Sequence, residues 1–413
     1  MSLDRIANTD RLFRWSAIAL GASIPVSTAL DNVLIVIALL AWTFSGIIPE
    51  TICFSFKNKW LLFPPMLLGL LALGILYGDT PWREAFSTLG KYADLIFIPM
   101  FAMAFREHKT RIKALHAFAI TIAIVVALSY LIRFGVMPEM PFMTGNAASP
   151  TVFKLKITHS ILVAFGTFLF AWLGSTCAHR RLRLVWYSLS LLAALNVLLM
   201  VQGATGYLTL GALIILLGWE RIGQRGTVYA LIALTAVATV LLIVPNPFHE
   251  RVLAIQQEAQ QWRAEDASQT SSGLRLEFYK NTLDMIAAHP LSGVGTGGFA
   301  QAYVRQVQGS GKAETHNPHN EFLHIAAQIG IIGLLVLIAM FWMQWRSAKH
   351  LDTPMEQALA RGLVLTLVTG CMVNSLLLDH AEGLFYAWLS GLLYGGLKYG
   401  LPENLSEKFS AQK

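Results

Sequence analysis

The sequence predicts an all-α protein that is embedded in a membrane and crosses it many times. Hydrophobic residues make up 55% of the 413 residues and charged residues only 13%, a balance far from that of soluble domains. Apolar runs recur along most of the chain, and each is close to the roughly 20 residues that an α-helix needs to cross the hydrocarbon core. One long polar segment, 246–321, separates the ninth apolar run from the tenth.

The apolar runs predict about twelve transmembrane helices. They are expected at 13–29, 32–48, 60–77, 91–105, 112–134, 158–177, 184–202, 206–219, 227–245, 322–345, 362–378 and 383–399. The first run lacks a small-residue cleavage site and leads into a second span, so no cleavable signal is expected. The chain therefore divides into 1–245 with nine helices, a loop at 246–321, and 322–413 with three helices and a polar tail from about Leu401.

Loops rich in lysine and arginine alternate with loops that carry few, and this predicts the orientation. The first set holds Lys57, Lys59, Arg106, Lys109, Arg111, Lys113, Arg180, Arg181, Arg183, Arg221, Arg225, Arg346 and Lys349. By the positive-inside rule these loops are cytoplasmic, which places both termini inside and the long polar loop outside. The net charge of +7 follows from this topology, so no nucleic-acid partner is expected. The spacing of the three cysteines and the histidines predicts no metal site.

The outer loop is expected to fold. Two amphipathic helices are predicted at about 247–264 and 274–288, joined by a Ser/Thr/Asp/Gly-rich linker at 264–273. A glycine-rich turn follows at 293–299 and can be written G-x-G-x-x-G. A helix and Pro290 stand where the strand of a dinucleotide-binding motif should be. We therefore expect this turn to serve close backbone packing or to offer amides to an anion.

Two residues of this region are candidates for catalysis. His319 stands at the mouth of the tenth span, where the positive end of a helix dipole favours a neutral imidazole that can accept a proton. The alternative is a plain helix start with Asn317 as N-cap and Pro318 in the first turn. Arg275 opens the second amphipathic helix, and its guanidinium can hold phosphate oxygens in a bidentate fork. The alternative for Arg275 is a solvated surface side chain.

Further polar groups gather at the predicted outer ends of the spans and are expected to bind substrate. They are Arg83, Lys91, Lys154, Lys156, His159, His316, Asn320, Asp379 and Glu382. Outer cations run against the inside bias, and several are needed to hold a diphosphate. Each lysine alone could instead snorkel at the interface. His316 is an alternative base to His319, and Asp379 or Glu382 could orient either histidine.

The order of these segments resembles the O-antigen ligase and polymerase superfamily of bacterial envelope glycosyltransferases. The strongest similarity runs from Arg275 through Pro290-Leu291-Ser292-Gly293-Val294-Gly295 and His319-Asn320-x-x-Leu323 to Gly330-Ile331-Ile332-Gly333. Weaker similarity lies at 158–160, 202–208 and 379–383, and the span count and loop placement agree along the whole chain. One position departs from the family, because many relatives read G-R-T-G-Y where this chain reads Gly203-Ala204-Thr205-Gly206-Tyr207. Either another cation replaces that arginine or the chain is less active.

The resemblance implies a reaction and a place for it. The donor would be an O-antigen glycan on undecaprenyl diphosphate, and the acceptor a sugar hydroxyl of lipid A-core. The protein would lie in the bacterial inner membrane with its active site facing the periplasm. Transfer would invert the anomeric carbon, with His319 as base, Arg275 at the diphosphate, and neither cofactor nor metal.

Three alternatives share parts of this pattern. O-antigen polymerase uses the same donor with a second lipid-linked glycan as acceptor. Protein O-oligosaccharyltransferases usually carry additional outer sequence. A transporter of lipid-linked sugars would place charges near mid-membrane within repeated halves, whereas the ionisable residues here gather at one face.

Overall fold

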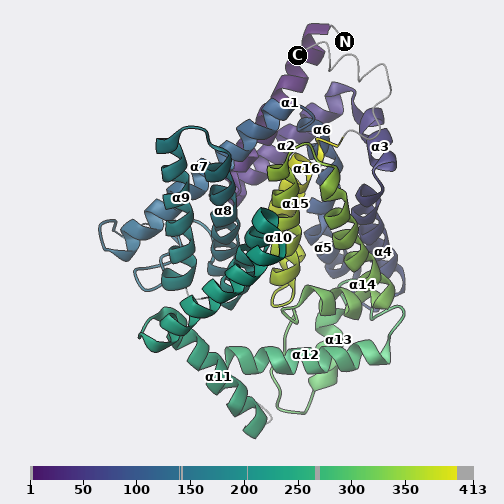
Figure 1. The fold of residues 1–413 in the computed structure, drawn as a ribbon. Coiled ribbons are helices and arrows are strands. Elements are labelled where there is room, and N and C mark those ends of the chain that lie inside the picture. The colour runs from purple at the N-terminus through teal and green to yellow at the C-terminus, as the bar shows by residue number, and fades with distance from the viewer. Residues whose placement is uncertain (1–2, 139, 141–142, 202, 266–269, 398–413) are drawn as a thin grey trace.

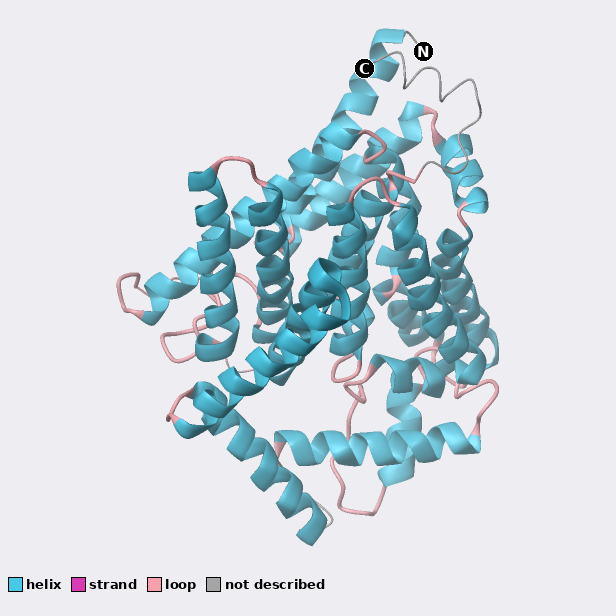
Figure 2. Ribbon diagram, viewed as in Figure 1, coloured by secondary structure: helices cyan, strands magenta, loops and turns pink. Residues whose placement is uncertain are grey.

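The computed structural model describes residues 3–138, 140, 143–201, 203–265 and 270–397 (Figure 1). These residues are mainly helical, and the only β pairing among them is an isolated bridge between Asn146 and Ser149 (Figure 2). The all-α architecture is therefore confirmed. The first helices are α1 Leu3–Ser23, α2 Thr28–Ser45, α3 Ile48–Lys57, η1 Lys59–Leu62, α4 Phe63–Tyr77, α5 Trp82–Lys91, η2 Ala93–Ile96, α6 Phe97–Ala104 and α7 His108–Arg133. The others are α8 Lys156–Thr176, α9 Arg180–Leu195, η3 Asn196–Met200, α10 Ala204–Ile243, α11 Pro247–Glu265, α12 Ser271–Ala288, α13 Phe299–Val307, α14 Glu321–Ser347, η4 Ala348–His350, α15 Pro354–Cys371, η5 Leu376–Leu378 and α16 His380–Tyr394.

Every expected span falls on helical structure. Seven helical segments of the described residues are long and apolar enough to cross a membrane: Thr28–Ser45, Lys59–Tyr77, His108–Arg133, Lys156–Thr176, Arg180–Met200, Ala204–Ile243 and Glu321–His350. The expected spans 206–219 and 227–245 both lie in α10, which non-helical backbone at Ile222 and Gly223 divides into two halves. The end of the last expected span, the polar tail, residue 202 and the middle of the 264–273 linker lie outside the described residues.

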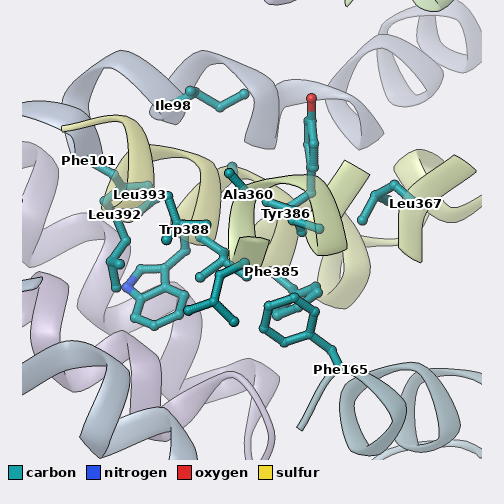
Figure 3. Close-up of a cluster of buried hydrophobic side chains, with 14 of the residues drawn as sticks. Ile98, Phe101, Phe165, Ala360, Leu367, Phe385, Tyr386, Trp388, Leu392 and Leu393 are labelled. Atoms are coloured by element: carbon teal, nitrogen blue, oxygen red, sulfur yellow. The ribbon is translucent and has the colours of Figure 1, made fainter. Parts of the chain in front are cut away.

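The centre of the bundle is formed by α8 and α16. Most of α16 is buried, and Figure 3 shows Phe385 and Trp388 of this helix beside Phe165 of α8. The rings of Phe165 and Phe385 meet edge-on with centroids 5.4 Å apart. The Trp388 indole N–H donates to the Ala17 carbonyl at 2.8 Å. A Cβ at Gly21 would lie 2.6 Å from the Trp388 ring, so only glycine lets α1 approach α16 this closely.

The glycine-rich turn fills a break in α14. Gly330 has φ of 69°, which interrupts the helix and leaves carbonyls free one turn earlier. The Val294 and Gly295 amides donate to the carbonyls of Ala327 and Gln328, each at 2.9 Å. The Thr296 amide donates to Gly74 of α4 at 3.1 Å. Of the two expectations for this turn, close backbone packing is confirmed, and these three amides are not available to an anion.

The segment between α10 and α14 forms a layer across one end of the bundle, at the opposite end from the start of α1 (Figure 1). Both amphipathic helices expected here are present as α11 and α12. Apolar residues of α12 and α13 pack with Ala327 of α14 in a separate small core that includes Phe278, Phe299 and Tyr303. This core fixes α12 over the beginning of α14.

Candidate functional site

The loop that leads into α14 holds His319 in a left-handed backbone conformation. His319 has φ of 55°, and it is the only non-glycine residue with positive φ among the described residues. This conformation crowds the Cβ and costs about 1–2 kcal/mol, so it persists only where the surroundings impose it. Residues held in this way occur often at active sites.

Side chains from distant helices impose that conformation. The His319 amide donates to Asn317 Oδ1 at 2.8 Å, and the Ser375 hydroxyl donates to the same oxygen at 2.7 Å. The Tyr279 hydroxyl, from α12, donates to the His319 carbonyl at 3.2 Å. The cap of α14 is Asn320, whose Oδ1 accepts the Leu323 amide at 3.0 Å. The alternative helix start with Asn317 as N-cap is therefore wrong, and His319 lies outside the helix.

The imidazole of His319 is half-buried against an aromatic ring. It stacks on Phe278 with centroids 6.3 Å apart and planes 25° apart. Neither ring nitrogen makes a hydrogen bond to any described residue. Burial lowers the pKa of His319 below its usual 6.5, and the nearby positive charge of Arg275 lowers it further. The ring is thus neutral near pH 7 and able to accept a proton.

Arg275 lies one turn before Tyr279 on α12 and faces the same region. Burial lowers the pKa of its guanidinium, and Arg251 of α11 acts in the same direction, while Tyr279 and Glu258 oppose it. Within the described part of the chain Arg275 makes no hydrogen bond or ion pair. A half-buried guanidinium without a matched carboxylate can bind an anion in a bidentate fork.

Arg251 of α11 lies near Arg275, and Lys156 lies near Arg251. Arg251 lies close enough to Lys156, at the start of α8, for their charges to interact. The one ion pair that the structure gives Arg251 is with Glu258, at 3.4 Å, and Glu258 also accepts the Ser272 amide at 2.9 Å. We call Lys156, Arg251 and Arg275 the α12 cation cluster. Among the described residues Glu258 is the carboxylate that pairs with this cluster, and the excess of positive charge makes the cluster suited to an anion.

A second polar region lies on the other side of α13 and does not include His319 or Arg275. It is a cavity of about 520 Å³ between α5, α13 and α14, which we call the α5 cavity. Its lining is Arg83, Glu84, Ser87, Thr88, Lys91, Gly297, Phe299, Ala300, His316, His324, Gln328 and Leu378. The expected anion-binding residues are therefore divided between two places: Arg83, Lys91 and His316 line the α5 cavity, and Lys156 belongs to the α12 cation cluster.

Two of the expected substrate-binding residues are instead buried and interact with other side chains of the bundle. The Lys154 ammonium is 7% exposed, donates to the Thr28 hydroxyl at 2.9 Å, and lies 3.5 Å from the buried Asp31 carboxylate. His159 is 2% exposed, and its Nε2 meets Asn196 Oδ1 at 3.1 Å. Since each side chain is committed to a partner in the bundle, neither is free to hold a diphosphate.

Three other expected residues also have different roles. Asn320 caps α14 with its Oδ1, and its Nδ2 donates to the Met372 carbonyl at 2.9 Å. Glu382 is buried and accepts the Thr158 hydroxyl at 2.6 Å. Asp379 is exposed, and its charge interacts with Lys91. Neither carboxylate contacts His319 or His316, so the expectation that one of them orients a histidine is not supported.

Arg251 and Tyr279 are the residues of this site that the sequence did not identify. Arg251 lies on a long amphipathic helix with many polar residues, and no local pattern separates it from them. Tyr279 follows Arg275 by four residues, a spacing that puts both on one helix face. That spacing is a signal that could have identified Tyr279.

Ala204 is the first residue of α10. The next residue, Thr205, accepts the Asn374 amide at 2.6 Å. Tyr207 packs on Phe248 of α11 with ring centroids 5.0 Å apart, and the charge of Arg251 reaches Tyr207. A cation from α11 therefore lies beside the start of α10. The described residues contain no group of three or more His, Cys, Asp or Glu side chains that could hold a metal ion.

Comparison with known protein families found a similarity for part of the chain. Residues 188–338 match a family model described as O-antigen ligase, a stretch that runs from α9 into α14 and includes Arg251, Arg275 and His319. No curated protein matches the chain. The chain has several helices long and apolar enough to span a membrane, and the family implies lipid-linked glycan substrates. This protein is therefore a multi-pass membrane protein in which residues 188–338 are similar to the O-antigen ligase family.

Proposed function

We propose that the protein is an inverting glycosyltransferase that moves an O-antigen glycan from undecaprenyl diphosphate to a sugar hydroxyl of lipid A-core. Transfer takes place at the periplasmic face of the bacterial inner membrane. The observation that carries the proposal is His319, a histidine in left-handed backbone conformation with unpartnered ring nitrogens beside the unpaired Arg275. This combination supports a base next to an anion site.

The α12 cation cluster binds the diphosphate of the donor. Negative charge grows on the diphosphate as the bond to the anomeric carbon breaks, and fixed cations stabilise that charge. Arg275 provides a bidentate fork, with Lys156 and Arg251 as further positive charges. Ala204 brings no charge to the start of α10, and Arg251, whose charge reaches Tyr207, supplies a cation there instead. The close approach of α11 to α10 supports this substitution.

His319 accepts the proton of the acceptor hydroxyl. As the proton leaves, the hydroxyl oxygen forms a bond to the anomeric carbon, and the carbon–oxygen bond to the diphosphate breaks with its electron pair going to the diphosphate. The proton is then lost from the imidazolium to water. The positive charge of Arg275 disfavours a protonated His319 before the reaction, which keeps the base ready. A positioned base contributes roughly 10²–10⁴-fold to the rate.

A transfer assay tests this proposal. Purified protein in lipid would receive chelator, undecaprenyl-diphosphate-linked glycan and lipid A-core, and the product would be glycosylated core. We expect His319→Ala to lose transfer while still binding undecaprenyl diphosphate. Near-normal transfer by His319→Ala would overturn the assignment of the base. Extension of the donor glycan without modification of core would identify a polymerase instead.

A further inference from the structure

We propose that the α5 cavity is the acceptor subsite and that it binds a sugar bearing a phosphate monoester. The assignment of this cavity to the acceptor rests on the proposed function, whereas the binding of a phosphate in the cavity does not depend on that function. The cavity is separate from the α12 cation cluster and has its own positive charges.

One face of α5 supplies most of the polar lining. Arg83, Ser87 and Lys91 recur every four residues, so they lie in a row along the helix, with Glu84 and Thr88 beside them. In contrast, Trp82 and Phe86 of the same helix are apolar and exposed, and their rings stack with centroids 5.9 Å apart. The helix thus turns donor groups into the cavity and aromatic rings away from that row.

Gln328 adds a buried donor without a partner. Its side chain is fully buried and lines the cavity, and its Oε1 accepts the Gly297 amide at 2.8 Å. Its Nε2 has no hydrogen-bond partner in the described residues. Tyr92 lies beside this amide and donates its own hydroxyl hydrogen to Glu321 at 2.8 Å. A buried unpaired N–H group is costly, which points to a ligand that accepts from it.

The lining offers more donors than acceptors. Arg83, Lys91 and the Gln328 amide donate, the Ser87 and Thr88 hydroxyls can donate, and Glu84 is the carboxylate among the lining residues. Glu84 already accepts the Gln301 amide at 3.2 Å. A phosphate monoester carries about two negative charges and three acceptor oxygens, and it matches a site with several donors and two cations. The cavity of about 520 Å³ leaves room for the sugar that carries the phosphate.

An aromatic wall separates the cavity from the base. Phe278, which packs on His319, meets Tyr303 edge-on at 5.8 Å, and Tyr303 stacks on Phe299 at 5.7 Å. Phe299 in turn lines the cavity and meets His324 at 5.2 Å. One diphosphate cannot occupy both places. The loop nevertheless joins them, because His316 lines the cavity and lies three residues before His319, at most about 11 Å of extended chain. A glycan anchored by its phosphate in the cavity can therefore offer a hydroxyl to His319.

Direct binding to the full-length protein in nanodiscs tests this inference. The probes are a phosphorylated core oligosaccharide released from its lipid and the same oligosaccharide after phosphatase treatment. The variant is the double substitution Arg83→Gln and Lys91→Gln, both at exposed positions. The matched control is Arg305→Gln, an exposed cation on α13 that does not line the cavity.

We expect the phosphorylated probe to bind, with about tenfold or greater loss of affinity after phosphatase treatment and a similar loss in the double variant. Arg305→Gln should bind as the unmodified protein does, and undecaprenyl diphosphate should not displace the probe. Equal binding of both probes, or unchanged binding by the double variant, would overturn the phosphate site. Displacement by undecaprenyl diphosphate would overturn its assignment to the acceptor. Because binding is measured without transfer, loss of the proposed reaction and loss of this subsite give different results.

Discussion

Two groups of charged side chains lie beyond the opposite ends of α14, and they differ in how the charges are matched. At the far end, Arg111 is 1% exposed and donates to Glu356 at 2.7 Å, to Asp352 at 2.9 Å, and to the Arg106 carbonyl at 3.0 Å. At the near end, the α12 cation cluster has three cations, and Glu258 is the carboxylate with which Arg251 pairs among the described residues. A buried charge that stabilises a fold is paired by its own neighbours, whereas a charge that binds a ligand is left unpaired.

The first prediction compares how much each of the two groups contributes to the stability of the protein. Arg111→Met leaves Glu356 buried without its partner, and we expect a loss of about 3–5 kcal/mol in the free energy of unfolding. Arg275→Met removes a charge that no carboxylate pairs, so we expect stability to change by less than about 1 kcal/mol. Thermal unfolding of both variants in the same detergent provides the measurement. Equal destabilisation would show that Arg275 is as structural as Arg111.

The second prediction concerns the shape of the cation. Arg275→Lys keeps the positive charge and loses the fork, so we expect kcat/KM for the donor to fall about 10–100-fold with unfolding unchanged. The measurement is transfer under varied donor concentration. Full activity in Arg275→Lys would mean that charge alone is needed, and that the diphosphate contact is not bidentate.

The third prediction is a shift of pH dependence. Burial and Arg275 both lower the pKa of His319 below 6.5, so the acidic limb of kcat/KM should lie below that pH. Arg275→Gln removes one lowering influence, and the pKa of His319 therefore rises. As the pH falls, the Arg275→Gln variant should therefore lose its residual activity at a higher pH than the unmodified protein loses its activity. If the acidic limb stayed in place or moved to lower pH, the titrating group would not be one whose pKa Arg275 lowers.

The smallest expected effect concerns Glu258, the carboxylate beside the α12 cation cluster. Glu258→Gln keeps an oxygen for the Ser272 amide and removes the negative charge beside Arg251, so donor affinity should rise about two- to threefold. Arg251→Gln should weaken donor binding several-fold in the opposite direction. Binding of undecaprenyl diphosphate measures both. If both substitutions changed affinity in the same direction, the charges of this pair would not act on the donor.

The helical spans could be predicted from the sequence because the membrane fixes the length of an apolar helix. The burial of α16 could not be, since lipid and protein interior favour the same apolar side chains and composition does not separate them. His319 and Arg275 became candidates from local pattern, because His319 precedes α14 and Arg275 lies near the start of α12. That α12 brings Phe278 and Tyr279 to His319 depends on a small core shared with α13 and α14, and such packing has no local signature.

The division of the outer cations illustrates the same limit. Lys154 and Lys156 are two residues apart, yet one is buried with Asp31 and the other is exposed beside Arg251. Their separation arises because α8 starts at Lys156 and the preceding segment folds toward α2. In contrast, Arg83, Ser87 and Lys91 recur every four residues, and because α5 forms at Trp82–Lys91 they lie on one face of this helix. What the sequence lacked was the partner of that face, which α13 and α14 provide.

The most direct measurement of the central claim is a structure of the protein bound to undecaprenyl diphosphate. We predict the diphosphate between Arg275 and Arg251, within reach of Lys156, with the His319 imidazole facing the site of the transferred sugar and the α5 cavity free of donor. A diphosphate bound by Arg83 and Lys91 in the α5 cavity, away from Arg275, would contradict it.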